Sequence, residues 1–561
     1  MPPTADSLTA TADPAAGRAA APEHGIRACL DSRGLRIDGP VAGAPTLLTL
    51  VTLPDGQLLG GVYGPVSLPE ARALVAGVSS GADPAGPDVP WLAVARAGRE
   101  GLAAAASTML PSGAFWSSTG GSLVVASDPA SASGDAPRIA AGYIRSYAAG
   151  EIDPAAAPFE GVARLPAGQT AVWEGATCAP RVHEWCGPGT WAAPGLAGPE
   201  ALRRFREAHD LVVADLAARA GAVVATVSGG LDSTFVAATL ASQAGPNRVV
   251  RGLTYSPLGG ARLELAPGMD ADELSFARLL EAAYPGRIEI EPVVNVAGVR
   301  PLAAAALAAR LAGVPTFNPA NQVWLNAMGD LAAQSGARLL FVGTNGNSAF
   351  SYDHGYAVRD SLRRRAWADL ARMSRTADGR LDLGLLRTRV MRPLGRAQMS
   401  RPEYLQWLAR RLTGLPAAAN PMALGGVLLA DPFTSRAVLE CAAAIAPAEW
   451  RMGGMNRAFA RRAGAGRVPD PIRLRTRRGQ QGRDAWHVIR NDRDDYLARI
   501  DAVPGVAGLE AVDAAALMAT VEAWPWGQEP PAPWREQVAA DRILGLAEFA
   551  SFGRWPGRRV P

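Results

Sequence analysis

The sequence predicts an α/β protein in which a sheet-rich domain precedes a doubly wound parallel sheet with a helical C-terminal part. From about residue 198 onwards, short apolar runs alternate with helical segments, which is typical of β-α-β units. Before that point, β-like runs follow one another with turn signals between them. The chain has 561 residues, 48% of them hydrophobic, which is enough for two or three domains with large cores.

Residues 1–25 and 26–190 are the first two predicted segments. Ala, Pro and small polar residues dominate 1–25, which predicts a disordered tail. Helical pieces at 68–76 and 136–149 interrupt the β-like runs of the second segment. Those runs are TLLTLVTL, LLGGVYG, WLAVARA, SLVVASDP and QTAVWEG, at residues 46–53, 58–64, 91–97, 122–129 and 169–175. We therefore expect a sheet-rich domain over residues 26–190.

Residues 198–550 are predicted to form the second domain, after a linker rich in Gly and Pro. Four strands are expected at residues 222–227, 249–256, 287–294 and 338–343. Helices are expected at residues 233–244, 272–283, 302–312 and 324–334, after an opening helix that begins at Pro199. This alternation predicts a doubly wound parallel sheet, and the chain from about Asp360 to the end is expected to be mostly helical.

The stretch AVVATVSGGLDS places a glycine turn between a predicted strand and a predicted helix. Gly229 and Gly230 allow a tight turn that an anion can approach closely. The N–H groups of the turn and the N terminus of the helix favour a phosphate, and the hydroxyls of Ser228 and Ser233 can donate to it. Asp232 would repel a phosphate unless it holds Mg²⁺, which bridges to phosphate oxygens.

Further binding residues are expected at the carboxyl ends of the strands, where an open parallel sheet binds its ligands. Val227 ends the first predicted strand, and Thr254 lies near the end of the second. The fourth strand runs into Gly343 and the loop GTNGNSAFSYDHG, which contains Asn347 and can cover a nucleotide. All 56 basic residues are arginines, so the SGGLDS turn is not a Walker A loop, which needs a lysine.

Two charged clusters fit a structural role as well as a functional one. Asp270 and Glu273 have the spacing of a capping box, so we expect them to begin the helix at 272–283 rather than to bind metal or substrate. Five arginines lie between Arg473 and Arg483. They fit a solvated face and a set of phosphate contacts about equally well.

Composition narrows the expected partners and compartment. The net charge of +4 is small for this length, so neither a nucleic-acid nor a membrane partner is expected. Four widely separated cysteines lack metal-ligand spacing, which predicts a reducing compartment without disulfides. We see no uncharged apolar run of bilayer length and no signal peptide pattern, and expect a cytoplasmic protein.

Several motifs together resemble the asparagine synthetase family. SGGLDS matches the pyrophosphate-loop signature of the ATP pyrophosphatases. DPF at 431–433 and RAFARRAGAGRVPDPIRLRTRRGQQGRDAW at 457–486 occur in the family's order and rough spacing. The GxxGN loop at 343–347, the RxRxxQ run followed by Asp and Trp, and NPANQVW at 318–324 are similar to the lasso peptide cyclase branch. The resemblance covers about residues 198–490.

This resemblance implies that ATP is cleaved between its α and β phosphates, giving AMP and pyrophosphate. In the cyclase branch, an Asp or Glu side chain of a core peptide is adenylated, and the peptide's N-terminal amine closes a macrolactam. The implied ligands are ATP and Mg²⁺. The implied partners are a precursor peptide, a leader peptidase that frees the amine, and a leader-recognition protein.

By the same resemblance, Asp232 holds Mg²⁺ and acts in catalysis with Arg477 and Arg478. The synthetases use a lysine near the triphosphate, and these arginines are the nearest equivalents that could neutralise pyrophosphate. The synthetases also have an acidic loop where this chain has GTNGN, so Asn347 stands where an aspartate would hold metal or pyrophosphate. The expected ATP and pyrophosphate contacts are Val227, Ser228, Gly229, Gly230, Asp232, Ser233, Thr254, Gly343 and Asn347.

The first domain resembles the glutaminase domain of these synthetases, an Ntn-hydrolase fold, only in its order and in short phrases. That glutaminase uses a cysteine exposed by removal of Met1, whereas position 2 here is proline and the first cysteine is Cys29. A cysteine inside the chain has no free α-amine to act as its base. We therefore expect a degenerate glutaminase-like domain, with the reacting amine supplied by a peptide's own N-terminus.

The sequence leaves three alternatives open. A β-lactam-type or other small-molecule amide synthetase uses the same loop and also lacks the cysteine. An asparagine synthetase that uses free ammonia would have to work with the altered acidic loop. A non-catalytic binding protein on this scaffold is the third alternative, and the intact SGGLDS motif argues against it.

Overall fold

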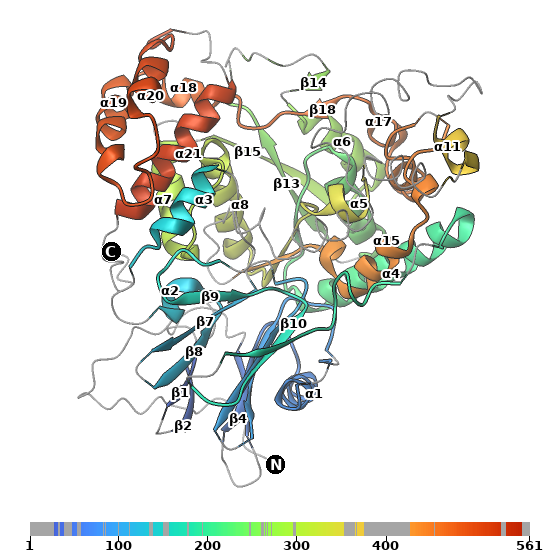
Figure 1. Cartoon of the computed structure of the whole chain (residues 1–561). Coiled ribbons are helices and arrows are strands. Elements are labelled where there is room, and N and C mark those ends of the chain that lie inside the picture. The colour runs from blue at the N-terminus through green and yellow to red at the C-terminus, as the bar shows by residue number, and fades with distance from the viewer. Residues whose placement is uncertain are drawn as a thin grey trace.

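The computed structural model contains two units, an N-terminal unit of antiparallel sheets (residues 27–184) and a parallel-sheet unit (residues 198–551) (Figure 1). The structure describes residues 27–551 except for several short stretches and the longer stretches 39–47, 353–364 and 375–426. The tail predicted at 1–25 lies outside the described residues.

The N-terminal unit stacks two antiparallel sheets face to face. The first has the strand order β2-β1-β8-β7-β9, and the second has the order β11-β10-β6-β5-β4-β3. The strands of the first sheet are β1 (Arg27–Asp31), β2 (Gly34–Asp38), β7 (Ala114–Thr119), β8 (Ser122–Ala126) and β9 (Val162–Leu165). Those of the second are β3 (Leu48–Thr52), β4 (Leu58–Tyr63), β5 (Leu92–Ala97), β6 (Gly101–Ala106), β10 (Gln169–Trp173) and β11 (Arg181–Glu184).

Strand β6 shows how this sandwich is filled. Side chains of a strand alternate between its two faces. Leu102, Ala104 and Ala106 accordingly lie in the core between the two sheets, whereas Ala103 and Ala105 lie under helix α1 (Leu68–Ser79). Alanines on the outer face let α1 approach the sheet closely. Helix α2 (Pro129–Ala132) packs on the other sheet, and α3 (Ala141–Ala149) follows it.

The parallel-sheet unit has the strand order β15-β13-β12-β16-β17, and all neighbouring strands are parallel. These strands are β12 (Val224–Thr226), β13 (Val250–Ser256), β15 (Ile288–Val294), β16 (Leu339–Phe341) and β17 (Leu428–Ala430). The chain starts at β12, adds two strands on one side and then two on the other, so the strand order reverses between β12 and β16. This confirms the predicted parallel sheet and places the switch point at the SGGLDS turn.

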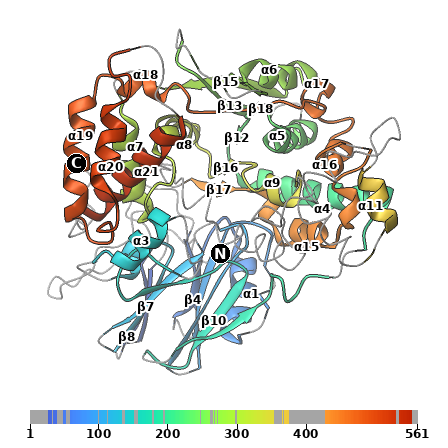
Figure 2. The same ribbon diagram turned by 45° about the horizontal axis from the view of Figure 1, so that its top comes forward.

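Helices cover both faces of this sheet (Figure 2). One buried cluster joins one face to helices α4 (Gly198–Arg219), α5 (Leu231–Gln243) and α6 (Leu274–Ala283). Another joins the opposite face to α8 (Gln322–Gln334). The other elements of this part of the chain are the two-residue strand β14 (Met269–Asp270), α7 (Pro301–Ala312), the short 3-10 helix η1 (Pro319–Asn321) and α9 (Gly346–Ala349).

Where the structure describes the C-terminal part, it is mostly helical as predicted, and it also contains a short edge strand. Residues 428–430 form β17, an edge strand beside β16, within the part that was expected to be mostly helical. A second two-residue strand, β18 (Arg478–Gly479), pairs with β14. The other elements are α11 (Trp367–Ser374), η3 (Pro432–Thr434), α15 (Arg436–Ala444), η4 (Pro447–Glu449), α16 (Ala458–Ala463), α17 (Asp470–Arg473), α18 (Ala485–Ile489), α19 (Arg493–Ala502), η5 (Val503–Gly505), α20 (Ala514–Glu522) and α21 (Trp534–Ser551).

The two units share buried surface at two places. Near α15, the backbone N–H groups of Arg436 and Ala437 donate to the carboxylate of Asp88 at 3.0 and 3.2 Å. On the other side, α3 packs against the C-terminal helices in one buried cluster, seen at the left of Figure 2. The Tyr147 hydroxyl donates to the carbonyl of Pro315 at 3.0 Å. The N-terminal unit is therefore an integral part of the fold.

Candidate active site

A cavity of about 460 Å³ lies at the carboxyl ends of β12, β13 and β16, where the strand order reverses. This volume lies within the range of pockets that hold a ligand of nucleotide size. Its lining includes Thr226 to Ser233, the residues Val342 to Thr344, and several arginines from the segment around α16 and α17. The cavity thus lies where the sequence predicted a binding site.

The SGGLDS turn is braced by its own side chains. The Ser233 hydroxyl accepts from the Ser228 N–H at 2.9 Å and contacts the Ser228 hydroxyl at 2.9 Å. The Gly230 N–H donates to the Ser228 hydroxyl at 3.3 Å. Gly229 has a positive φ of 64°, and a Cβ there would lie 2.8 Å from the Cβ of Phe276. Glycine is thus required at 229 both by conformation and by space.

The loop after β16 packs directly on this turn, and it does so through glycines. A Cβ on Gly343 would lie 2.7 Å from the backbone N of Ser233, and a Cβ on Gly346 would lie 2.5 Å from the Cβ of Asp232. Asp232 is buried, with 8% of its surface exposed, and lines the cavity. The loop therefore packs against Asp232, which lies in the first turn of α5.

Behind the loop, Asp431 at the end of β17 accepts hydrogen bonds from the N–H and the side-chain amide of Asn345, at 2.8 and 3.1 Å. The Phe433 N–H donates to its other oxygen at 3.1 Å. Burial raises the pKa of Asp431 to about 7, and the nearby carboxylate of Asp232 adds to the rise. The DPF motif thus holds the GTNGN loop in place.

Asn347 lines the cavity and accepts a hydrogen bond from Arg457 at 3.0 Å. Arg457 has a φ of 56°, a left-handed conformation that is uncommon for residues other than glycine. Such conformations persist only where the surrounding structure enforces them, and they concentrate at functional sites. The arginine thus places a cation beside Asn347 at the edge of the cavity.

Arg461 holds the arginine-rich segment against the cavity. Its guanidinium donates to the carbonyls of Arg473 at 2.5 Å, Arg475 at 2.9 Å and Asn456 at 2.9 Å. Burial is the main cause that lowers the pKa of Arg461, with a contribution from the neighbouring arginines. The buried Arg461 side chain thereby holds three backbone carbonyls in place, and the segment after α17 is held next to the SGGLDS turn.

The charge of the cavity wall favours an anion. Among the described residues that line it, five are arginines and two are carboxylates: Arg457, Arg461, Arg473, Arg475, Arg477, Asp232 and Glu273. No group of three or more potential metal ligands occurs among the described residues. Asp232 fits a Mg²⁺ ion that takes most of its ligands from phosphates and water, as nucleotide-bound magnesium does.

One wall of the cavity is apolar. It is formed by the ends of β13 and β16 and by α8, through Leu253, Tyr255, Trp324, Leu325, Met328 and Val342. The rings of Trp324 and Tyr255 lie 5.1 Å apart at an angle of 43°. The Tyr255 hydroxyl donates to the buried carboxylate of Asp484, which also accepts from the Leu258 N–H at 2.8 Å and from Asn295 at 2.9 Å. A flat, uncharged ligand group fits this wall.

Most of the residues proposed from the sequence lie together here. The cavity is lined by Val227, Ser228, Gly229, Gly230, Asp232, Ser233, Gly343, Asn347 and Arg477. Thr254 is buried and does not line it, because its neighbours Leu253 and Tyr255 face the cavity and side chains alternate along a strand. The backbone of Arg478 lies in β18, and its side chain lies outside the described residues.

The sequence patterns did not single out Arg461, they included Arg475 only as one of five arginines between 473 and 483, and they assigned Glu273 wrongly. Helix α6 begins at Leu274, Glu273 makes no side-chain cap, and Asp270 lies in β14, so the predicted capping box is wrong. Asp270 instead pairs with Arg475 and Arg477. The alternation of arginines in RLRTRR could have indicated that Arg475 and Arg477 point to the same side, since an extended segment presents every second side chain to one side.

A basic cavity at the switch point of a doubly wound sheet, built on a glycine turn, defines a nucleotide-binding α/β protein. A family model described as Asparagine synthase matches residues 205–544, and the chain belongs to this family. Its members are ATP-dependent ligases that form amides, and this chain falls in that class.

No curated protein matches the chain. None of the described helices combines the length and the apolar character needed to cross a membrane.

Proposed function

We propose that the chain is an AMP-forming peptide cyclase of the lasso peptide type. An Asp or Glu side-chain carboxylate of a core peptide attacks the α phosphorus of ATP, and the bond to the bridging oxygen breaks to release pyrophosphate. The peptide's N-terminal amine then attacks the acyl carbon, AMP leaves, and the amine loses a proton as the isopeptide bond closes the macrolactam. Adenylation is needed because a carboxylate does not react with an amine, and AMP leaves far more readily than oxide.

The observation that carries the AMP-forming part is the SGGLDS turn facing five arginines across one cavity. The turn would hold the triphosphate through the N–H group of Gly229 and the start of α5. Arg477 and its neighbours would neutralise the leaving pyrophosphate, which arginine does well through paired hydrogen bonds. Asp232 would hold Mg²⁺, whose charge offsets that of the phosphates.

The described thiols do not fit the nucleophile of a glutaminase, which would supply ammonia as the amine. Cys29 is buried in β1. Burial raises the pKa of Cys186 to about 12 and that of Cys441 to about 11, so neither thiol is activated at neutral pH. This supports a degenerate glutaminase-like role for the N-terminal unit, and an amine that arrives with the substrate. A precursor peptide, a leader peptidase and a leader-recognition protein are the partners that we propose.

The choice of a peptide rests on the resemblance of GTNGN, NPANQVW and RTRRGQQGRDAW to the cyclase branch. Two of these segments meet in the structure, where a Cβ on Gly482 would lie 2.1 Å from the side-chain oxygen of Asn321. Each of these two segments also contributes a lining residue to the cavity, Trp324 and Gln481. Positioning of the two peptide ends would supply much of the rate enhancement.

A small-molecule amide synthetase, such as one that forms a β-lactam, is the second candidate. The cavity volume of about 460 Å³ favours it, because a nucleotide and a small carboxylate together would fill such a space. An ammonia-dependent asparagine synthetase shares the chemistry, but its acidic loop is replaced here by GTNGN with Arg457 bound to Asn347.

Mass spectrometry tests the proposal. The protein would be incubated with Mg·ATP, the leader peptidase, the recognition protein and a precursor peptide encoded near its gene. We expect the core peptide to lose one water and to resist carboxypeptidase, with AMP formed in step. A matched core peptide with its acceptor Asp or Glu changed to the amide should remain linear. AMP formation without a cyclised peptide would favour the small-molecule synthetase, and no AMP with any carboxylate would favour a binding protein.

A further inference from the structure

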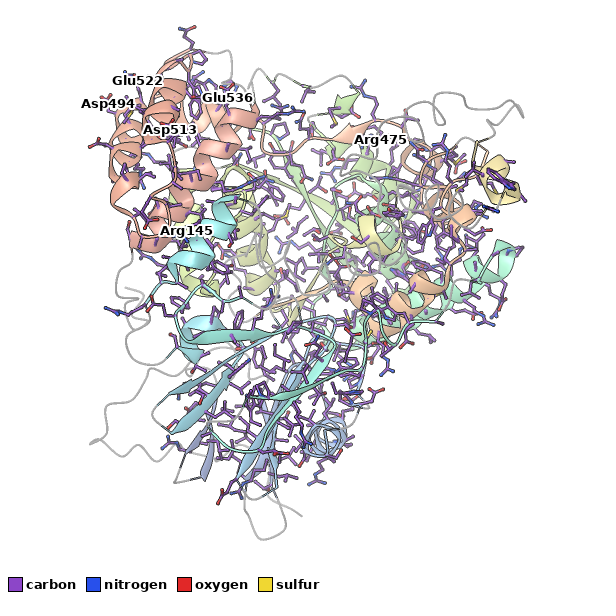
Figure 3. The ribbon with its side chains drawn as sticks, in the orientation of Figure 1. Arg145, Arg475, Asp494, Asp513, Glu522 and Glu536 are labelled. Atoms are coloured by element: carbon purple, nitrogen blue, oxygen red, sulfur yellow. The ribbon has the colours of Figure 1, made fainter. Side chains whose placement is uncertain are left out.

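Arg475 lines the cavity, and Figure 3 shows its side chain among those of the parallel-sheet unit. Its side chain is 7% exposed. Nε and Nη2 donate to one oxygen of Asp270 at 3.1 and 2.6 Å, and Nη1 donates to Glu273 at 3.3 Å. The guanidinium also lies 3.8 Å from the ring centre of Phe276. Its geometry is therefore set by two acidic residues and a ring.

The remaining contact of Arg475 reaches the phosphate-binding turn. Nη1 donates to the carbonyl oxygen of Gly229 at 3.2 Å. In a trans peptide the carbonyl and the following N–H point in opposite directions. Holding the Gly229 carbonyl towards Arg475 therefore turns the Gly230 N–H the other way, towards the Ser228 hydroxyl, to which it donates at 3.3 Å. Arg475 thus sets the direction of a donor in the turn.

Glu273 sits between Arg475 and the segment after β18. It is 3% exposed, and its second oxygen accepts from Gln481 at 3.2 Å. A Cβ on Gly479 would lie 2.0 Å from its carboxyl carbon, so the chain passes directly over the carboxylate. Such a carboxylate next to a phosphate-binding turn would weaken anion binding by its charge alone. Its pairing with Arg475 gives it a different role.

We propose that Glu273 is a positioning residue for the nucleotide, acting through Arg475. Together with Asp270 it orients the guanidinium that holds the Gly229 carbonyl and thereby preorganises the SGGLDS turn. This inference rests on nucleotide binding at that turn, as in the proposed function, and is independent of which carboxylate or amine reacts. It makes Glu273 favourable for ATP binding in spite of its negative charge.

The test is the affinity for the ATP analogue with a methylene group between the α and β phosphorus atoms, in the presence of Mg²⁺. Titration calorimetry would be applied to the wild type, Glu273→Ala and Glu273→Gln. We expect the Kd to rise about tenfold for Glu273→Ala, since a hydrogen bond to a charged group is lost, and about threefold for Glu273→Gln, whose carbonyl can still accept. If Glu273 were only a nearby negative charge, both variants would bind the analogue more tightly than the wild type.

Asp272→Asn is the matched control, because it removes the same charge one residue away. Asp272 is exposed, accepts from the Leu274 N–H at 2.9 Å, and asparagine can replace it in that cap. We expect the Kd of this variant to stay within about twofold of the wild type. Thermal unfolding of each variant checks that it has folded, and Glu273→Gln covers the case in which Glu273→Ala does not fold.

The pH dependence of the Kd distinguishes this positioning role from a purely structural role, which would leave it unchanged. Burial raises the pKa of Glu273 to about 7, and the groups that face it are Arg475, Gln481 and Asp270. Because the carboxylate is protonated below this value, the wild-type Kd should rise between about pH 8 and pH 6 and approach that of Glu273→Gln, which lacks this titration. Titration of the nucleotide affects both proteins equally.

The outcomes separate the two proposals. The role of Glu273 would be overturned if the wild type bound the analogue and both Glu273 variants bound it equally well or more tightly. It would also be overturned if the wild type and Glu273→Gln showed the same pH dependence of the Kd. In both cases the proposed function would stand. Absence of analogue binding by the folded wild type would overturn both.

Discussion

Replacement of Gly346 by alanine should disable the site without unfolding the protein. Gly346 begins α9, and a Cβ there would lie 2.5 Å from the Cβ of Asp232, 2.6 Å from its Cγ and 2.7 Å from its Oδ1. Ordinary van der Waals contact begins at 3.4 Å, so the two residues must separate by about 0.9 Å. Asp232 cannot give way easily, because it is buried and its backbone is held in the first turn of α5.

The effect on activity follows from this displacement. A misplacement of about 1 Å at a reacting centre can cost about 100-fold in rate, so kcat/KM for AMP formation should fall by about that factor. Helix propensity acts in the opposite direction, since alanine is favoured over glycine in a helix by about 1 kcal/mol. The melting temperature should therefore change little compared with the activity.

The assay is AMP release from Mg·ATP with the carboxylate substrate, measured beside thermal unfolding. Gly142→Ala is the matched control, because Gly142 also lies in a helix, α3, and a Cβ there would meet nothing within 4 Å. We expect this control to keep wild-type activity. If Gly346→Ala retained activity within about twofold, the placement of Asp232 against the loop would be refuted.

Three further predictions concern the site and its surroundings. Asp232→Ala should lower AMP formation about 100-fold or more while the protein stays folded, and an unchanged rate would favour a non-catalytic binding protein. Tyr255→Phe should lower the free energy of unfolding by about 1–3 kcal/mol in denaturant titration, because buried Asp484 loses a donor; an unchanged value would contradict this network. Burial raises the pKa of Asp541 from 3.8 to about 7, so the native state keeps a proton that the unfolded chain releases. The free energy of unfolding of the wild type should therefore fall, relative to Asp541→Asn, by up to about 4 kcal/mol as the pH rises from about 4 to 7, and parallel pH profiles would contradict this assignment.

The parallel sheet could be predicted because its signals are local. Apolar runs such as AVVATV and the glycines after them specify a strand and a turn within a dozen residues. Strand β17 was missed since it has only three residues, Leu428–Ala430, and forms an edge whose existence depends on pairing with β16. A strand of this length is defined by its neighbour rather than by its own propensity.

The site was predictable where one motif supplies the geometry, and less so where distant segments meet. The glycine turn and Asp232 lie in the cavity as expected. Thr254 was misjudged because the alternation of a strand decides which of two adjacent residues faces the ligand. Glu273 and Arg475 are 202 positions apart, and their pairing depends on β14 and β18 lying side by side. Spacing alone favoured a capping box for Glu273, and tertiary contacts overrode it.

In the proposed reaction, ATP is cleaved between its α and β phosphates at the SGGLDS turn. Phosphorus NMR of a reaction with Mg·ATP and the core peptide tests it most directly, since the products have separate signals. We expect AMP and pyrophosphate in equal amounts, each matching the amount of cyclised peptide. ADP and orthophosphate would contradict it.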